Sequence, residues 1–505
     1  MRVWKQMIGM VGLTACVEGS SALRHPPDDS DSVGLDTVIA TEPEDSDVVP
    51  TAPETVVVSH PREMRAVWVA TVQNINFPSR TGLSAGALRS ELKNIVDITQ
   101  RAGLNAIVMQ VRPEGDALYH SELEPWSRYL TGSQGGDPGL DPLAELIAEA
   151  HPKHIEVHAW LNPYRAKASA SSTAVSPHIS KIYPEYCYTY AGKLWMDPGS
   201  PEVRERAIDV VTDLVSRYAI DGIHFDDYFY PYPDGTEFPD AATYAASGTT
   251  LSKSDWRRQN VDRFVEDVRD ALDATAPWVR YGIAPFGIYR PGQPPGITGL
   301  DQYTALFADP MVWMDNDWLD YMAPQLYWSH DNPGQEFGKL MEWWGDNVDA
   351  EYAWPGLNFS SLGESDFPLA EFELQTQLSR DEVGEGESGQ LWYSIAPLLD
   401  DRLGSIDWMR DTLYPEPADS PPIRALAGPA VEPTVVVEGA SVKVSYSGAT
   451  PLRSYQVYRD EAGSWVWQDR VEAGATTIAL DSGRYGISAL DRAGRESLGV
   501  VVEIP

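Results

Sequence analysis

Eight short apolar runs alternate with helix-like segments along most of this chain of 505 residues. The runs occupy residues 64–72, 105–113, 156–164, 222–230, 281–287, 321–328, 352–358 and 390–397. Such runs are typical of parallel strands, which are covered on both faces and joined by helical crossovers. Strand-then-helix units repeated in this way predict an α/β fold, a (β/α)8 TIM barrel over residues 61–415. A doubly wound open sheet is the alternative, but no glycine-rich phosphate loop follows the first run.

The segments between the runs show helical periodicity and helix start signals. The clearest spans residues 200–218, where Ser200 is placed to cap the helix and Pro201 stands in its first turn. Apolar residues then recur at helical spacing, which predicts one face packed against the sheet. Residues 87–104, 256–272 and 336–344 follow the same pattern.

The N-terminus predicts a location outside the cytoplasm. Two basic residues precede an apolar stretch too short to span a bilayer, and the following LTAC resembles the lipobox of bacterial lipoproteins. Residues 1–16 are expected to be a lipoprotein signal peptide with Cys16 as the lipidated residue, and an ordinary secretory signal is the alternative. The next residue, Val17, is not the aspartate that retains lipoproteins at an inner membrane. This favours anchoring to the outer membrane if the host has two membranes.

The two ends of the predicted barrel differ from it in composition. Residues 17–60 are rich in Asp, Glu, Pro, Ser and Thr, which predicts an acidic, disordered tether. Residues 416–433 have the composition of a linker. Residues 434–505 alternate apolar and polar side chains in short runs, which predicts a small all-β sandwich. This last segment looks like a fibronectin type III module.

Composition limits the class of partner. The formal net charge of −37 argues against nucleic acid, because phosphate binding needs clustered Lys and Arg. The 17 Trp and 24 Tyr residues are compatible with platforms for sugars, although core packing accounts for most of them. We expect a monomer without a cofactor or a metal ion. The histidines at 151, 154 and 158 open the third run, on the barrel face away from the chemistry, and are expected to be structural.

Polar and aromatic residues gather where catalytic residues of such barrels lie, at the C-terminal ends of the strands. We expect these residues to bind substrate: Trp160, Asn162, Tyr164 and Arg165 in the second half of the third run or directly after it, His224 and Tyr228 within the fourth, Phe286 near the end of the fifth, Gln325 and Tyr327 near the end of the sixth, and Asn358 at the end of the seventh. Trp195 joins them from the loop before the helix capped by Ser200. Aromatic faces stack on sugar rings, and polar groups bond the hydroxyls. The set predicts an aromatic-walled bowl for a glycan.

Two adjacent aspartates, Asp226 and Asp227, lie in the fourth run, directly after its apolar start. Alternation along the strand places Asp226 inside the barrel mouth together with His224, and Asp227 at the rim in a supporting role. Cleavage of a glycosidic bond needs a second carboxylate. Asp116, after the second run, is the first choice, and Glu114, Glu122, Asp331, Glu364 and Asp400 stay open. The structural alternative is that the aspartates only bind arginines or backbone amides.

Several long motifs, in order, resemble one known family over residues 61–415. They are REMRAVWVATVQNINFPS, QVRPEGDALYHSELEPWSRYLTGSQG, HAWLNPYR, WMDPGSPEVR, DGIHFDDYFYP and APQLYW. They resemble glycosyl-hydrolase-like family ten, a group of bacterial extracytoplasmic TIM-barrel proteins. The resemblance implies a peptidoglycan glycosidase that cuts glycan strands stripped of their peptides. It also implies an active-site bowl built from Asp116, Asn162, Arg165, Asp226, Asp227 and Tyr228.

Two other functions stay open at this point. One is a glycan-binding lipoprotein that uses the same bowl without turnover. The other is a glycosidase that acts on a different extracellular polysaccharide.

Overall fold

The computed structural model describes residues 53–348, 352–384, 386–426 and 428–505. The predicted lipidation site Cys16, with the predicted signal peptide and most of the predicted tether, lies outside the described residues. Within those ranges, no helix combines the length and the apolar character that a membrane crossing requires.

A parallel sheet forms the centre of the fold, in the order β11-β10-β9-β8-β4-β3-β2-β13-β12. Its strands are β2 (Met64–Val69), β3 (Ala106–Arg112), β4 (Glu156–Leu161), β8 (Gly222–Phe225), β9 (Arg280–Ile283), β10 (Tyr321–Met322), β11 (Tyr352–Ala353), β12 (Gly356–Leu357) and β13 (Gly389–Trp392). Every predicted run overlaps a strand, and the seventh run contains two. The predicted parallel α/β fold is confirmed.

The two outermost strands of the sheet belong to one short stretch of chain. β11 pairs with β10, and β12 pairs with β13. A further parallel bridge joins Gln325, after β10, to Gly356 of β12. The sheet is therefore curled, and its form is consistent with the predicted TIM barrel.

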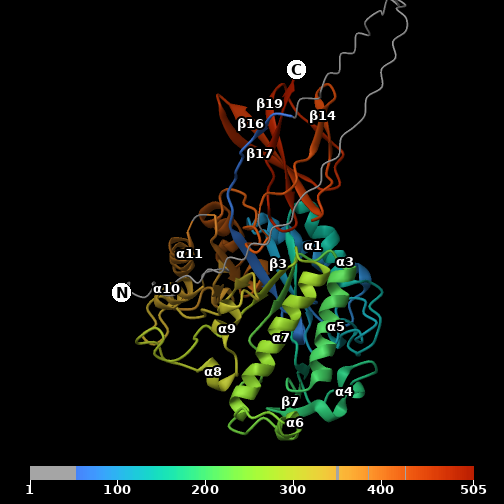
Figure 1. The fold of residues 1–505 in the computed structure, drawn as a ribbon, viewed down its shortest axis with the longest axis vertical. Coiled ribbons are helices and arrows are strands. Elements are labelled where there is room, and N and C mark those ends of the chain that lie inside the picture. The colour runs from blue at the N-terminus through green and yellow to red at the C-terminus, as the bar shows by residue number, and fades with distance from the viewer. Residues whose placement is uncertain (1–52, 349–351, 385, 427) are drawn as a thin grey trace, which may run out of the picture. The chain divides into compact units, whose positions relative to one another are not determined.

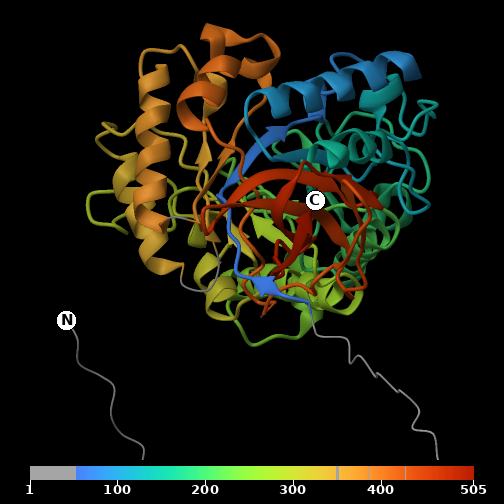
Figure 2. The ribbon, with the colours of Figure 1, turned by 90° about the horizontal axis from the view of Figure 1, so that it is seen from above.

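Helices cover the outside of the sheet (Figures 1 and 2). The longer ones are α1 (Ala85–Arg101), α3 (Pro142–Ala150), α5 (Pro201–Arg217), α7 (Lys253–Thr275), α10 (Phe337–Asn347) and α11 (Leu369–Val383). The shorter ones are α2 (Arg128–Thr131), α4 (Ile179–Ile182), α6 (Ala241–Ser247), α8 (Gln302–Ala305), α9 (Pro310–Asp315), α12 (Ala396–Leu399) and α13 (Ser405–Trp408). The four predicted helices are confirmed. Ser200 caps α5 as expected, because its hydroxyl accepts a hydrogen bond from the amide of Val203 at 3.3 Å.

Strand alternation divides the apolar residues into two layers. On β2, Val67 and Val69 join the core between sheet and helices, whereas Ala66 and Trp68 join a second core inside the sheet. This inner core fills the centre of the curled sheet and closes it below the strand ends.

A small antiparallel sheet extends the loop after β4. It contains β5 (Arg165–Lys167), β7 (Lys193–Met196) and β6 (Cys187–Tyr190), in that order. Arg165 pairs with Trp195 in this sheet, so the sheet fixes the backbone of a residue predicted to bind substrate. Cys187 is a partly buried free thiol.

The C-terminal residues form an all-β unit, here called the C-terminal β-domain. One antiparallel sheet has the order β1 (Thr55–Val56), β20 (Gly499–Ile504), β19 (Gly483–Asp491), β16 (Leu452–Glu461) and β17 (Ser464–Glu472). The other has the order β14 (Thr434–Val437), β15 (Ser441–Ser445) and β18 (Thr477–Ala479), and both sheets contribute to one apolar core. The likeness to a fibronectin type III module stays a prediction.

The predicted tether, residues 17–60, extends too far. Thr55 and Val56 pair with Val500 and Gly499, so these tether residues form an edge strand of the C-terminal β-domain. Backbone hydrogen bonding in β1 offsets the polar composition that predicted disorder.

The predicted linker, residues 416–433, is also corrected over its first part. Asp419, Ser420 and Ile423 are each at most 2% exposed. Asp419 accepts hydrogen bonds from Gln456 at 3.1 Å and from Arg470 at 2.9 Å. These buried contacts make the segment a packed joint between barrel and C-terminal β-domain rather than a spacer.

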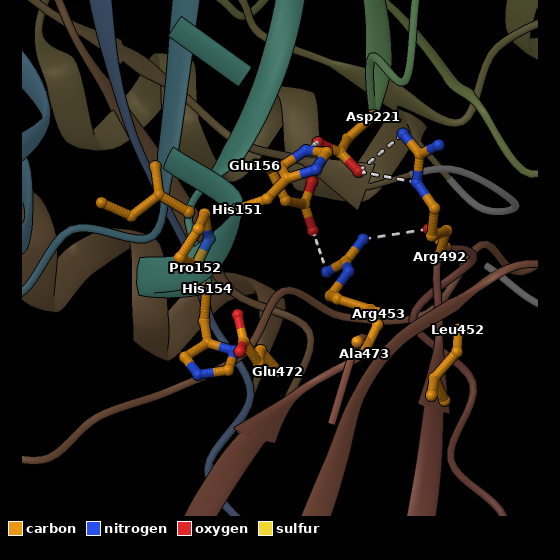
Figure 3. A pocket seen from close by; sticks show the side chains of 12 residues that line it. His151, Pro152, His154, Glu156, Asp221, Leu452, Arg453, Glu472, Ala473 and Arg492 are labelled. Atoms are coloured by element: carbon orange, nitrogen blue, oxygen red, sulfur yellow. Dashed lines mark hydrogen bonds and ion pairs between the residues drawn. The ribbon is translucent and has the colours of Figure 1, made fainter. Parts of the chain in front are cut away.

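Buried ion pairs join the N-terminal ends of the barrel strands to the C-terminal β-domain (Figure 3). Arg453 pairs with Glu156 at the start of β4, and Arg492 pairs with Asp221 before β8 at 3.0 Å. Although burial alone would raise it, the charge of Arg492 holds the pKa of Asp221 well below its ordinary value. His151 and His154 line a cavity of about 160 Å³ beside these pairs, at the barrel end where the sequence predicted them.

Candidate active site

A cavity of about 280 Å³ opens at the C-terminal ends of the parallel strands. Of the residues predicted to act on substrate, Trp160, Arg165, His224, Asp226, Asp227, Tyr228, Gln325 and Tyr327 line it. Its volume is close to the lower end of the range for small-molecule sites, about 300 Å³. These residues lie in or shortly after β4, β8 and β10, so several strands contribute to one site.

Asp226 is 5% exposed and is fixed by donors from the neighbouring strand. Trp160 Nε1 donates a hydrogen bond of 3.1 Å to Oδ2, and Asn162 Nδ2 donates to the same oxygen. The other oxygen, Oδ1, accepts only a longer bond of 3.3 Å, from the amide of Tyr228. Burial and the charge of Asp227 raise the pKa of Asp226 to about 7. The carboxyl group therefore holds its proton for a substantial part of the time at neutral pH.

Asp227 also lines the cavity, and this corrects the prediction that it lies at the rim. β8 ends at Phe225, so strict strand alternation no longer applies two residues later. Asp227 accepts a hydrogen bond from the hydroxyl of Tyr232. Burial raises the pKa of Asp227, and the Tyr232 hydroxyl opposes that shift by stabilising the anion.

Asn162 links the polar side chains on one side of the cavity. Its amide nitrogen donates to Asp226, and its oxygen accepts from Gln110 at 2.6 Å and from Arg165 at 2.7 Å. Arg165 also donates from Nε to the carbonyl of Pro113 at 2.9 Å. The guanidinium lies 5.5 Å from the centre of the Tyr228 ring. Asn162 itself lies behind the cavity wall, where it orients Asp226 and Arg165.

His224 lies at the bottom of the cavity and is fully buried. Its Nε2 accepts a hydrogen bond from Trp68 at 3.2 Å, and its Nδ1 contacts the Tyr321 hydroxyl at 2.9 Å. Burial holds the pKa of His224 well below its ordinary value. His224 is therefore a neutral ring that supports the site.

The structure does not bring Asp116 to the cavity wall. Asp116 is fully buried, and one oxygen accepts a hydrogen bond from Gln134 at 3.3 Å. Burial and the charge of Glu114 raise the pKa of Asp116 to about 7. The arrangement in which Asp116 faces Asp226 across the cavity is thus not the one observed, because Asp227 lies beside Asp226 instead.

Four other predicted residues also lie off the wall. Tyr164 packs against Phe264 in the outer core, and Trp195 lies behind Tyr228 with ring centres 6.4 Å apart. Phe286 contacts the rings of Tyr232 and Trp328. Asn358 donates to Ser361 at 3.1 Å. These residues support the site from behind.

Three residues of the site were not predicted from the sequence. Gln110 lines the cavity from β3, Tyr393 lines it directly after β13, and Tyr232 bonds Asp227. The position of Tyr393 at a strand end was the signal that could have revealed it. Nowhere in the described ranges do three or more His, Cys, Asp or Glu side chains form a group that could hold a metal ion. The absence of a metal and of a cofactor stays a sequence prediction.

Comparison with known proteins places the chain in a family. Residues 63–363 match the family model described as glycosyl hydrolase-like 10. Glycosyl hydrolase YngK of Bacillus subtilis (strain 168) is 36% identical over 371 residues, covering 71% of this chain and 73% of that protein. Glycosyl hydrolase DigH of Escherichia coli (strain K12) is 34% identical over 325 residues, covering 60% of this chain and 74% of that protein.

Among solved structures, the PgaB (BpsB) glycoside hydrolase domain from Bordetella bronchiseptica matches with a TM-score of 0.47 and 13% identity, over 69% of this chain and 98% of that one. The endo-β-1,4-mannanase from Thermotoga petrophila matches with a TM-score of 0.42 and 9% identity, over 88% of this chain and 98% of that one. The family match and the two curated relatives decide the assignment: the chain belongs to the glycosyl hydrolase-like 10 family and is a glycoside hydrolase.

Proposed function

We propose that this enzyme cleaves glycosidic bonds in a glycan of the bacterial envelope, namely peptidoglycan strands whose peptides have been removed. The observation that carries the proposal is a pair of buried carboxylates, Asp226 and Asp227, on the wall of one aromatic cavity. Glycosidic bond hydrolysis uses two carboxyl groups in different protonation states.

Asp226 is the proposed general acid. Its oxygen Oδ2 accepts two hydrogen bonds from side chains, so the proton resides on Oδ1, which has the weaker contact. A pKa of about 7 matches an acid that works near neutral pH. In the reaction the proton passes from Oδ1 to the oxygen of the leaving sugar.

Asp227 is the proposed ionised partner. The hydroxyl of Tyr232 donates to it and stabilises its negative charge. That charge in turn favours the protonated form of Asp226. The carboxylate is placed to stabilise the positive charge that develops on the sugar ring, or to act on the anomeric carbon directly or through water.

The aromatic side chains supply surfaces for sugar rings. Trp68, Trp160, Tyr228, Tyr327 and Tyr393 line the cavity, and the rings of Tyr327 and Tyr393 stack on each other at 5.7 Å. Trp160 has two roles, because its ring lines the cavity and its nitrogen donates a hydrogen bond to Asp226.

The test is release of reducing ends from purified glycan strands freed of peptides by an amidase. Wild-type enzyme is expected to release them, and Asp226→Asn is expected to release almost none. Strands from other envelope and extracellular polysaccharides serve as comparison substrates. Cleavage of one of those alone would refute the substrate assignment, and binding of strands without any cleavage would refute the mechanism.

We also propose that the enzyme works outside the cytoplasm, attached through a lipid on Cys16. The support is the LTAC sequence at residues 13–16 after a short apolar stretch. Growth with a labelled fatty acid is expected to label the wild-type protein and not Cys16→Ala. Equal labelling of the two proteins would refute the anchor.

A further inference from the structure

Arg165 is the one arginine or lysine among the described residues that line the cavity. Arg165 is 6% exposed, so its charge is nearly removed from bulk water. A buried guanidinium costs free energy unless a carboxylate or other acceptors compensate it. The question is which group compensates Arg165 in the working enzyme.

Other buried arginines in the described part of the chain have carboxylate partners. Arg112 pairs with Glu124 at 2.5 Å, and Arg257 pairs with Asp240 at 2.7 Å. Arg165 has no such ion pair in the described ranges; its Nε and Nη2 donate to neutral oxygens of Pro113 and Asn162. The third nitrogen, Nη1, has no hydrogen-bond partner among the described residues and belongs to a side chain on the cavity wall.

The two aspartates of the cavity are not the carboxylate partners of Arg165. Asp226 is held by Trp160 and Asn162, and Asp227 is held by Tyr232. Neither carboxyl group forms an ion pair with Arg165, although the charge of Arg165 lowers the pKa of both from a greater distance. The direct contacts of Arg165 are the two neutral acceptors and the Tyr228 ring. Nη1 is thus left for a ligand.

We propose that Arg165 binds a carboxylate carried by the sugar that lies next to Asp226, so that the enzyme selects a glycan with a free acid group on the ring. This inference rests on the proposed function, because it names what the same cavity recognises. In peptidoglycan the acid group is the lactyl carboxylate of N-acetylmuramic acid, which is free once the peptide is gone and is an amide while the peptide remains.

Charge makes this selection effective. The protein has a formal net charge of −37 and repels an anionic strand at long range, so a cation at the site gives local attraction where the strand must sit. A guanidinium donates charge-assisted hydrogen bonds to a carboxylate and weaker ones to an amide. A bound anion near Asp226 also favours the protonated form of that acid.

The experiment compares two versions of one substrate. Peptide-free strands are used either with free lactyl carboxylates or after conversion of these groups to methylamides. Wild-type kcat/KM is expected to be about 10- to 100-fold higher on the free acid, because losing a hydrogen bond to a charged group weakens binding by about that factor. Arg165→Gln replaces the guanidinium with a neutral group, whereas Arg165→Lys keeps a positive charge. Arg165→Gln is expected to lose most of the preference, and Arg165→Lys to keep part of it.

Arg128→Gln is the matched control. Arg128 pairs with Glu114 at 2.7 Å and does not line the cavity, so its loss should change kcat/KM by the same factor on both substrates. If Arg165 only holds Asn162 in place, Arg165→Gln will likewise slow both substrates equally, which overturns the proposal. Equal rates of the wild-type enzyme on acid and amide overturn it as well.

A binding measurement separates this proposal from the proposed function. Asp226→Asn is titrated with N-acetylmuramic acid and with its methylamide, monitored by the fluorescence of the cavity tryptophans. Tighter binding of the acid supports Arg165 as its receptor even if no strand is cleaved, in which case the proposed function alone fails. Equal affinity for acid and amide, together with strand cleavage, leaves the proposed function standing and refutes the role of Arg165.

Discussion

Asp221 and Asp226 stand at opposite ends of β8, which is only four residues long. Asp221 is bound by Arg492 of the C-terminal β-domain at 3.0 Å, and Asp226 faces the cavity. One strand therefore connects the buried ion pairs below the barrel to the site above it. The two aspartates are both buried but have opposite pKa shifts: the cation Arg492 lowers the pKa of Asp221 in spite of burial, whereas burial and the anion Asp227 raise the pKa of Asp226.

The first prediction concerns Asp226→Asn. The amide keeps the shape of the side chain but cannot give a proton to the leaving sugar, so kcat should fall about 10²- to 10⁴-fold. Reducing-end release gives the rate, and an unchanged circular dichroism spectrum verifies the fold. Asp116→Asn, made in parallel, identifies the partner carboxylate: a comparable loss there would favour Asp116 over Asp227.

The second prediction is a pH dependence set by Asp226. Because the acid form is active, kcat/KM should fall as the pH rises through about 7. Trp160→Phe removes a donor that stabilises the anion, so the pKa of Asp226 should rise and this basic limb should move to higher pH. A limb that stays in place or moves to lower pH would show that Asp226 does not produce it.

The third prediction concerns Tyr232→Phe. Loss of its hydroxyl removes the hydrogen bond to Asp227, which should raise the pKa of that carboxyl. Since Asp227 acts as the anion, the acidic limb of the kcat/KM profile should move to higher pH. Tyr289→Phe is the matched control, because its hydroxyl contacts Asp309 at 3.1 Å outside the cavity. The control should leave both limbs unchanged.

The fourth prediction concerns Arg492→Ala. The substitution leaves Asp221 buried without its main cation, and the free energy of unfolding should fall by about 3–5 kcal/mol in denaturant titrations. The folded pKa of Asp221 is depressed, so its contribution is present above the ordinary pKa of an aspartate and is lost as the pH falls through the lower, folded value. The difference between variant and wild type should therefore shrink in acid.

Arg484→Gln is the comparison for this fourth prediction. Arg484 pairs with Glu54 and Asp460 at the surface of the same domain, where water screens the charges, so the midpoint should hardly change. Equal effects of the two substitutions would mean that the buried Arg492–Asp221 pair contributes no more to stability than a surface pair does.

The sequence predicted what depends on local pattern. Strand runs, the Ser200 cap and the position of Asp226 after β8 all follow from periodicity and from the rule that strand ends carry the site. The rule succeeded for Trp160, His224 and Tyr327, which line the cavity. The rule cannot tell which residues beyond a strand end face the cavity, because the direction of each side chain there depends on the turns of the loop.

The wrong predictions for the carboxylates of the site concern residues that lie beyond strand ends. Asp116 and Asp227 both lie past a strand end, so alternation could not decide which of them faces Asp226. The tether and linker predictions failed over Thr55–Val56 and Asp419–Ile423 for another reason. Composition reports how polar a segment is, but the partners that compensate Asp419, namely Arg470 and His60, are distant in sequence.

Strand β1 has a consequence for how the enzyme can be held at a surface. The described chain begins at the C-terminal β-domain, which contacts the starts of the barrel strands, whereas substrate enters at their other ends. Any attachment through earlier residues therefore joins the described part of the protein at the barrel end opposite the cavity. The cavity mouth then lies at the barrel end away from the attachment point, where a long glycan has free access to it.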